Sequence, residues 1–379
     1  MQQSTVKLQM VDLHRQYLRL KEEIDAAVLG VIESGQFVGG PMVRRFADSL
    51  AGYLGVKHVI PCANGTDALQ IAIMALGLQP GDEIISVGFT FVATTEVIAL
   101  LGLKPIFVDI DPRTYTIDVN QIERAITPRT KCIVPVHLYG QCADMEAIMA
   151  LADKYNLYVI EDNAQAIGAD YRMSDGTIHK AGTIGHMGCT SFYPSKNLGC
   201  YGDGGAVFTN NDRLAENLQM IANHGQREKY TSDVVGVNSR LDGIQAAVLQ
   251  SKLPHLDEYN RARQEAADFY DHSFAQHDRL TIPYRAPYST HVFHQYTLLT
   301  DNSIDRDALR EQLQQKGVPT MVYYPIPTHL QKAYAQFGYR PGDLPITEHA
   351  AQKVISLPMH SEMTKEELTY IVESVLLSV

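Results

Sequence analysis

Short apolar runs alternate with longer segments of helical spacing between about Tyr17 and Leu253. This alternation is typical of βα units that feed a mostly parallel sheet. The helices are predicted from spacings such as Leu69, Ile73 and Leu76, which share one face at 3.6 residues per turn. Strands are expected at 57–62, 83–87, 105–108, 130–136, 157–160 and 206–209, and helices at 66–76, 93–101, 144–155 and 213–224.

The pattern changes after Pro254. A long polar helix at 256–273 precedes an alternating segment at 292–300, expected to be a strand, and a helix at 306–316. We therefore expect a large α/β domain over residues 1–253 and a smaller α+β domain over residues 254–379. Residues 1–16 would be able to pack on the small domain.

Composition favours a globular protein that acts on small molecules. The 379 residues are 45% hydrophobic, which is ample for a core, and the formal net charge of −11 includes no basic run. A nucleic-acid or membrane partner is therefore not expected. Because no segment has signal-peptide character or the roughly 20 apolar residues of a membrane span, we expect a cytoplasmic location.

Five scattered cysteines form no C-x-x-C pair. Their number and spacing predict reduced, mostly buried thiols and argue against a disulfide framework or a zinc knuckle. No metal site is expected.

One candidate site segment is Asn64-Gly65-Thr66-Asp67, between a predicted strand and a predicted helix. Glycine lets the backbone approach a ligand, and the free N–H groups of a helix start form a phosphate site. The alternative is an ordinary N-cap in which Thr66 or Asp67 satisfies the first turn. Taken alone, the segment favours the cap.

A second segment places Glu161 and Asp162 at the carboxyl end of a buried strand, where ligands bind in open α/β sheets. Asp162 could pair with a protonated pyridine nitrogen and keep a cofactor ring electron-withdrawing. Glu161 is expected to be a structural neighbour, and Gln165 could reach a ring hydroxyl oxygen. The alternatives are a solvated strand end and a magnesium carboxylate that lacks its partner motif.

A third segment, residues 191–199, places Lys196 among aromatic residues, with the glycine-rich residues 202–205 after it. A lysine that forms a Schiff base needs a desolvated setting that lowers its pKa. Most lysines are surface charges, and that is the alternative here.

Together these segments resemble the DegT/DnrJ/EryC1/StrS family of nucleotide-sugar aminotransferases. The resemblance covers essentially the whole chain and is carried by CANGTDALQ, GFTFVAT, VIEDNAQAIGA, TSFYPSKNLGCYGDGGA and GVNSRLDGIQAA, in this order. It implies the fold-type I architecture of pyridoxal-phosphate enzymes, with a mostly parallel seven-stranded sheet in the large domain.

The resemblance implies roles for positions that match these motifs. Lys196 would hold pyridoxal 5'-phosphate as a Schiff base, with Asp162 facing the pyridine nitrogen and Gln165 the ring oxygen. Phe91 would stack on the ring, although a core phenylalanine is the alternative. The cofactor phosphate would be held by Gly65, Thr66 and Ser191.

The resemblance also implies a homodimer with shared active sites, because Asn238 in this family reaches the phosphate of the neighbouring subunit. Arg240 would be available to a sugar acid or diphosphate, or would be an unpaired surface residue. Tyr324 and His329 are candidate substrate contacts. Many relatives carry a histidine before Tyr-Pro-x-Pro, whereas this chain has Tyr323 there. That departure leaves the exact sugar open.

The implied reaction is a ping-pong transamination from glutamate to a keto nucleotide sugar, with Lys196 as the acid–base group. Within the family, the wording of residues 126–131, 138–144, 198–206 and 236–242 is most similar to members that aminate UDP-2-acetamido-2-deoxy-3-oxo-D-glucuronate for cell-surface polysaccharide (O-antigen or lipopolysaccharide) synthesis. A dTDP-linked 3-oxo or 4-oxo 6-deoxy sugar is the alternative substrate.

The sequence disfavours three other functions. A sugar dehydratase that uses pyridoxamine phosphate would lack the lysine. A cofactor-binding regulator without turnover would have a degraded set of catalytic residues. A nicotinamide dehydrogenase would need a G-x-G-x-x-G turn in the first βα unit, which is missing.

Overall fold

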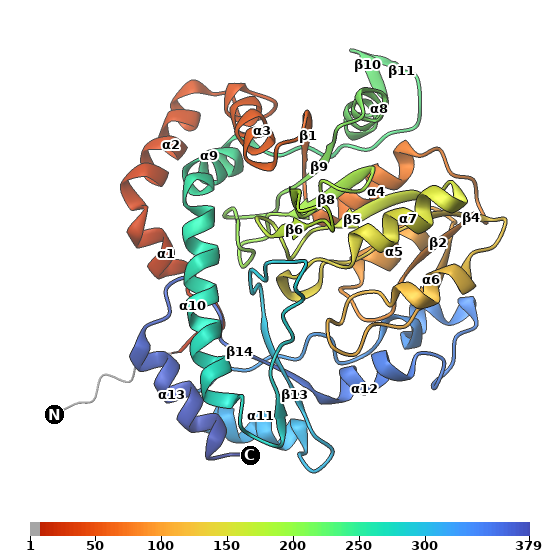
Figure 1. The fold of residues 1–379 in the computed structure, drawn as a ribbon. Coiled ribbons are helices and arrows are strands. Elements are labelled where there is room, and N and C mark those ends of the chain that lie inside the picture. The colour runs from red at the N-terminus through yellow and green to blue at the C-terminus, as the bar shows by residue number, and fades with distance from the viewer. Residues whose placement is uncertain (1–7) are drawn as a thin grey trace.

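A seven-stranded sheet forms the centre of the computed structural model, which describes residues 8–379 (Figure 1). Its strand order is β1-β9-β8-β5-β4-β2-β3, and within it only β9 runs antiparallel to its neighbours. The prediction of a mostly parallel seven-stranded sheet is therefore confirmed. The strands are β1 (His58–Cys62), β2 (Glu83–Val87), β3 (Lys104–Val108), β4 (Thr130–Ile133), β5 (Tyr158–Asp162), β8 (Met187–Ser191) and β9 (Gly205–Thr209).

Helices cover both faces of this sheet (Figure 1). One face packs against α4 (Gly65–Ala75), α5 (Ala93–Leu100) and α8 (Asp212–Ala222). The other face packs against α6 (Val119–Ala125), α7 (Met145–Tyr155), α3 (Pro41–Leu54) and α9 (Gly243–Lys252). Successive residues such as Ile84 and Ile85 enter opposite cores, which explains why the strands read as continuous apolar runs.

A second layer is built around a three-stranded antiparallel sheet. Its strands are β12 (Leu280–Thr281), β13 (Tyr296–Thr300) and β14 (Val354–Leu357), and α11 (Arg306–Gln315) and α13 (Lys365–Leu376) pack against them. The long helix α10 (Leu256–Phe274) runs from the central sheet into this layer (Figure 1). The boundary proposed at Pro254 lies in the 3-10 turn η2 (Leu253–His255), just before α10.

The strand expected at 292–300 begins only at Tyr296, so its first four residues were wrongly assigned. Residues 292–295 instead bind loops beside the central sheet: Val292 N–H donates to Gly140 O, and Asn197 Nδ2 donates to Val292 O. Their backbone groups form hydrogen bonds with these loops and not with a neighbouring strand.

Segments near both ends of the chain connect the central sheet with the three-stranded sheet. The first helices are α1 (Leu13–Arg19) and α2 (Lys21–Ser34). Just before α1, Met10 O accepts from Met359 N–H, and within α1 Arg15 forms an ion pair with Glu367 at 2.6 Å. Residues 1–7, part of the segment expected to pack on the small domain, lie outside the described residues. The turns η3 (Thr328–Leu330) and η4 (Lys332–Phe337) and the helix α12 (Pro345–Lys353) return to the central sheet, where the Asp109 carboxylate accepts from Ile346 and Thr347 N–H at 2.8 Å.

Smaller features complete the described chain. Two hairpins join β6 (Asp170–Arg172) to β7 (Ile178–Lys180) and β10 (Gln226–Glu228) to β11 (Thr231–Ser232), and a short turn η1 spans Leu138–Gly140. None of the helices within residues 8–379 has the length and apolar character needed to cross a membrane. All five cysteines are buried and free, as predicted.

Candidate active site

The three candidate segments meet at one edge of the central sheet. β5 ends at Asp162, β8 ends at Ser191, and β1 ends at Cys62, two residues before Asn64. These strands run in the same direction, so their carboxyl ends share the edge where ligands bind in open α/β sheets.

The start of α4 offers a place for an anion. Asn64, in an extended conformation, is the N-cap, and its side chain accepts from Asp67 N–H at 2.8 Å. The alternative in which Thr66 or Asp67 caps the helix is therefore wrong, since both are already inside the first turn. A Cβ on Gly65 would lie 2.7 Å from Ser191 Cβ, so only glycine lets β8 approach the helix start this closely. Gly65, Thr66 and Ser191 thus surround a helix N-terminus that suits a phosphate.

Lys196 lies in the loop after β8. The neighbouring Asn197 amide anchors this loop by donating to Asn260 Oδ1 at 2.7 Å and to Val292 O at 2.9 Å. Lys196 Nζ has no hydrogen-bond partner among the described residues. Desolvation lowers the pKa of Lys196 to about 8, and the negative charge of Asp162 partly offsets this effect. The amine is therefore partly a free base near neutral pH, as a carbonyl-binding lysine requires.

Asp162 is only 6% exposed and points to the α5 side of β5. Thr94 Oγ1 donates to Asp162 Oδ2 at 2.7 Å, and Ala164 N–H donates to Oδ1 at 3.2 Å. Donors of this kind stabilise the ionised carboxylate. An ionised carboxylate accepts about four hydrogen bonds, so capacity for a protonated ring nitrogen is left.

The Gln165 side chain bridges two parts of the chain. Its Oε1 accepts from Tyr139 N–H at 2.8 Å, and its Nε2 donates to the Tyr324 hydroxyl at 3.0 Å. Burial raises the pKa of Tyr324, which keeps this hydroxyl protonated. Tyr324, from the C-terminal part of the chain, is thus brought to the Asp162 edge.

Phe91 is 55% exposed, and its ring centroid lies 6.2 Å from that of Tyr324. The alternative of a core phenylalanine is therefore wrong. An exposed aromatic ring at the rim of a site is suited to cover a planar cofactor.

Three candidate residues remain: Asn238 for the cofactor phosphate, and Arg240 and His329 for the substrate. Asn238 and Arg240 are exposed, and Ser239 between them accepts from Ala63 N–H at 3.1 Å, which places their loop beside the turn from β1 to α4. His329 is 1% exposed, and its Nε2 lies 3.2 Å from Glu348 Oε1. These are the surroundings of a buried structural histidine.

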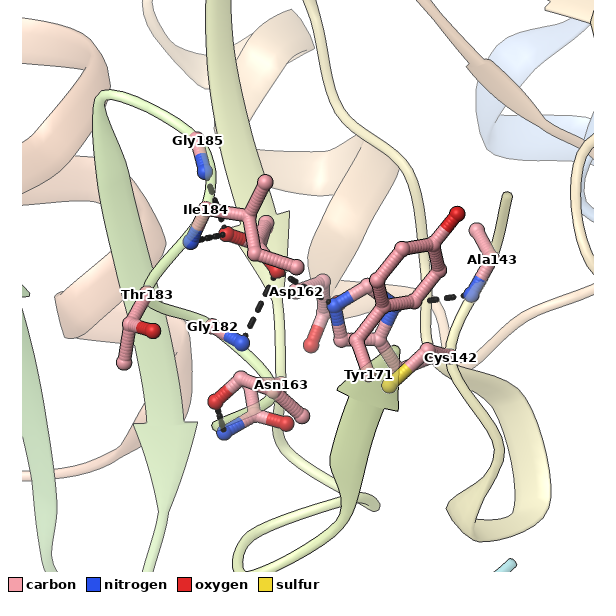
Figure 2. Close-up of polar contacts among 12 residues, drawn as sticks. Cys142, Ala143, Asp162, Asn163, Tyr171, Gly182, Thr183, Ile184 and Gly185 are labelled. Carbon is pink, nitrogen blue, oxygen red and sulfur yellow. Dashed lines mark hydrogen bonds and ion pairs between the residues drawn. The ribbon is translucent and has the colours of Figure 1, made fainter. Parts of the chain in front are cut away.

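Glu161 lies on the opposite face of β5 from Asp162, fully buried. It accepts from His137 Nε2 at 2.7 Å, and Ala143 N–H donates to His137 Nδ1 at 3.1 Å, so the imidazole is neutral with its hydrogen on Nε2. The remaining donors come from the turn before β8 (Figure 2): the N–H groups of Gly182, Ile184 and Gly185, at 2.8, 2.7 and 2.5 Å. Glu161 therefore holds this turn against β5 and is a structural neighbour of the site.

A further residue near Lys196, not predicted from the sequence, is His294. Desolvation, with the nearby charges of Lys196 and Arg263, holds the pKa of His294 well below its ordinary value. Its Nδ1 is buried and has no hydrogen-bond partner among the described residues. The sequence shows two histidines at 291 and 294, but nothing in their spacing indicates that His294 lies near Lys196.

Comparisons with known proteins agree on one group. The model of the DegT/DnrJ/EryC1/StrS aminotransferase family matches residues 18–376. The UDP-2-acetamido-2-deoxy-3-oxo-D-glucuronate aminotransferase of Pseudomonas aeruginosa is 50% identical over 353 residues, which is 93% of this chain and 95% of that protein. The pleiotropic regulatory protein of Geobacillus stearothermophilus is 47% identical, with 97% of each chain covered. Several relatives named as dTDP-amino-sugar transaminases also match.

Solved structures give the same picture. The crystal structure of NtdA from Bacillus subtilis, with bound cofactor PMP, matches with a TM-score of 0.90 and 35% sequence identity. The match covers 98% of this chain and 85% of that one. The resemblance inferred from the motifs is therefore confirmed over nearly the whole chain.

Proposed function

Because the chain belongs to the DegT/DnrJ/EryC1/StrS aminotransferase family, we propose that it transfers the amino group of glutamate to a keto nucleotide sugar. Membership makes it an aminotransferase that depends on pyridoxal 5'-phosphate. The observation that carries the proposal is the meeting, at one sheet edge, of the Lys196 amine, the buried Asp162 carboxylate and the Gly65–Ser191 contact. Within residues 8–379 the Lys196 amine has no hydrogen-bond partner. The amine suits the aldehyde of the cofactor, the carboxylate suits its ring nitrogen, and the start of α4 beside Ser191 suits its phosphate.

Each site residue has a separate role in the proposed reaction. When bound, pyridoxal phosphate supplies an electron sink for the carbon that loses a proton. Lys196 would hold the cofactor aldehyde and then carry a proton on Nζ to and from the reacting carbon. Asp162 would bind the ring nitrogen, Gln165 the ring oxygen, and Phe91 would cover the ring. The cofactor phosphate would be bound by Gly65, Thr66 and Ser191.

The proposed acceptor is UDP-2-acetamido-2-deoxy-3-oxo-D-glucuronate. Support comes from the Pseudomonas aeruginosa relative, whose name gives this substrate. Arg240 is exposed and has no ion-pair partner among residues 8–379, so its guanidinium is free to bind a carboxylate or a diphosphate in two-pronged fashion. Tyr324 stays a candidate contact for the sugar, whereas the buried His329, paired with Glu348, does not. The amino sugar would serve cell-surface polysaccharide synthesis, with the reaction in the cytoplasm.

A homodimer with shared sites is part of this proposal. Asn238 and Arg240 follow the β10–β11 hairpin, which projects from the body of the molecule (Figure 1). Two large apolar side chains on the same stretch, Tyr230 and Val235, are almost fully exposed. Exposed apolar side chains beside candidate site residues suit a contact with a second copy of the chain. Asn238 would then bind the cofactor phosphate in the active site of that second copy.

Two alternatives have support in the names of relatives. A dTDP-linked sugar is favoured by the dTDP-amino-sugar transaminases among them. A regulator is favoured by the Geobacillus stearothermophilus protein. The regulator would not need the complete set of Lys196, Asp162 and Gln165 that this chain keeps.

A substrate panel separates these possibilities. The purified holoenzyme is offered glutamate together with 3-oxo and 4-oxo sugars linked to UDP or dTDP, and product masses are followed. We expect amination of the UDP-linked 3-oxo uronic acid. Amination of 4-oxo sugars alone would refute the proposed ring position, and failure of glutamate to convert the bound cofactor would favour the regulator.

A further inference from the structure

The Thr94 hydroxyl touches the carboxylate that is proposed to bind the cofactor ring. Thr94 is the second residue of α5 and is 1% exposed, and its Oγ1 lies 2.7 Å from Asp162 Oδ2. This hydroxyl has one hydrogen, whereas an ionised carboxylate can only accept. The hydrogen of Thr94 therefore points to Asp162 and not to Phe91 O, which is 3.4 Å away.

A second buried hydroxyl stands behind the first. Thr90 Oγ1 lies 3.3 Å from Thr94 Oγ1. Because Thr94 uses its own hydrogen on Asp162, Thr90 is left as the donor of this pair. The hydrogen bonds then run from Thr90 to Thr94 to Asp162, and each polarises the next in a dry setting.

The aspartate needs such support because the terminal torsion of its side chain is broad and roughly two-fold. Thr94 holds Oδ2 from helix α5, and Ala164 N–H holds Oδ1 from the loop after β5. Two donors from two different elements fix the plane of the carboxylate. Loss of Thr94 would leave only the longer contact, at 3.2 Å.

We propose that Thr94 is a positioning residue for the amino transfer: its hydroxyl fixes the Asp162 carboxylate in the orientation that holds the cofactor ring nitrogen protonated. The proposal rests on the role proposed above for Asp162. It goes beyond that role in naming the group that makes the aspartate effective.

The chain offers a matched control in Thr95, the next residue of the same helix. Thr95 is fully buried, and its Oγ1 has no hydrogen-bond partner among the described residues. Thr94→Val and Thr95→Val therefore make the same chemical change one residue apart, and only the first removes a hydrogen bond. Thr94→Ser keeps the hydroxyl and serves as the rescue variant.

The experiment uses holoenzyme loaded with pyridoxal phosphate labelled with ¹⁵N at the ring nitrogen. The ¹⁵N chemical shift reports ring protonation, and a single turnover with saturating glutamate reports the rate of amino transfer. For Thr94→Val we expect a shift toward the unprotonated ring and a rate lower by about tenfold to a hundredfold, as for the loss of a hydrogen bond to a charged group. Thr94→Ser should recover most of both, and Thr95→Val should resemble the native enzyme.

The variant Asp162→Asn distinguishes a failure of the role proposed for Asp162 from a failure of the role proposed for Thr94. A native ¹⁵N shift and rate in Asp162→Asn would refute the role of the aspartate itself. A defect in Asp162→Asn together with native behaviour in Thr94→Val would overturn the Thr94 proposal alone. Should Thr94→Val fail to fold, Thr94→Cys keeps a similar volume with a weaker donor and is judged by the same two readouts.

Discussion

Burial sets the chemistry of the residue at the centre of the site. The pKa of Lys196 lies at about 8, below its ordinary value of 10.5, because desolvation outweighs the attraction of Asp162. A lysine attacks the cofactor aldehyde only as the neutral amine. The rate of pyridoxal phosphate uptake by the apoenzyme should therefore rise with pH through about 8 and level off above it. A stopped-flow absorbance series checks this, and a rate that keeps rising toward pH 10 would contradict it.

Phe91 and Phe89, two residues apart, should respond in opposite ways to truncation. Phe91 is exposed, whereas Phe89 is fully buried in the core. Phe91→Ala should weaken cofactor binding and change the free energy of unfolding by under about 1 kcal/mol, since no cavity forms. Phe89→Ala should cost about 3–5 kcal/mol by creating a cavity. Urea denaturation and cofactor titration measure both, and a large loss of stability in Phe91→Ala would refute its placement at the rim.

The residues predicted from sequence were those inside local motifs. Asp162 follows an apolar strand, and Lys196 follows an aromatic and glycine-rich stretch, so each could be recognised from its neighbours. Thr94 and His294 could not, because what singles them out is contact or proximity to a residue far away in the chain. Hydrogen bonds between distant segments leave no local pattern.

At the scale of elements, the turn before β8 depends on one buried carboxylate. Glu161 accepts three backbone N–H groups and the imidazole of His137, all away from water. In Glu161→Gln one acceptor becomes a donor, which leaves at least one buried N–H group unpaired. We expect a loss of roughly 2–4 kcal/mol in the free energy of unfolding, by urea denaturation.

A control for this change is Glu216→Gln, on the exposed side of α8. It makes the same chemical substitution in water and should stay within about 0.5 kcal/mol of the native stability. Equal effects of the two substitutions would mean that the buried network does not stabilise the turn.

Elements were predictable where the local pattern was strong. The six strands of the central sheet that were assigned by residue range carry apolar runs and appear within a few residues of their expected bounds. No range was assigned to β8, because Gly188, Thr190 and Ser191 give it no apolar run, and its place is set by pairing with β5 and β9. The expected start of β13 failed because residues 292–295 bind the loop of Asn197.

At the scale of the whole molecule, the proposed dimer makes a prediction about mixed subunits. If Asn238 serves the site of its neighbour, Lys196→Ala and Asn238→Ala homodimers are both defective. Subunit exchange then produces heterodimers in which one site has both native residues. Random mixing should restore about a quarter of native activity, half of the dimers having one good site of two. Mixtures no more active than their parents would show that Asn238 serves its own chain.

The architecture could be predicted from the alternation of strands and helices, and the family from its five motifs. The return of the C-terminal part to the central sheet could not. Asp109 binds Ile346 and Thr347, and Gln165 binds Tyr324, across more than 150 residues of sequence. Such long-range contacts follow from tertiary packing. A division of the chain into two consecutive domains does not predict them.

The most direct test of the account is to locate the lysine that binds the cofactor. A second lysine could compete for the cofactor aldehyde, because burial also lowers the pKa of Lys252 to about 8. Lys252 Nζ, however, donates to Gly199 O at 2.8 Å and lies 4.3 Å from the centroid of the Tyr201 ring, whereas Lys196 Nζ has no partner among the described residues. Borohydride reduction of the holoenzyme, followed by peptide mapping, should place the pyridoxyl group on Lys196. A label on Lys252 or on any other lysine would contradict the account.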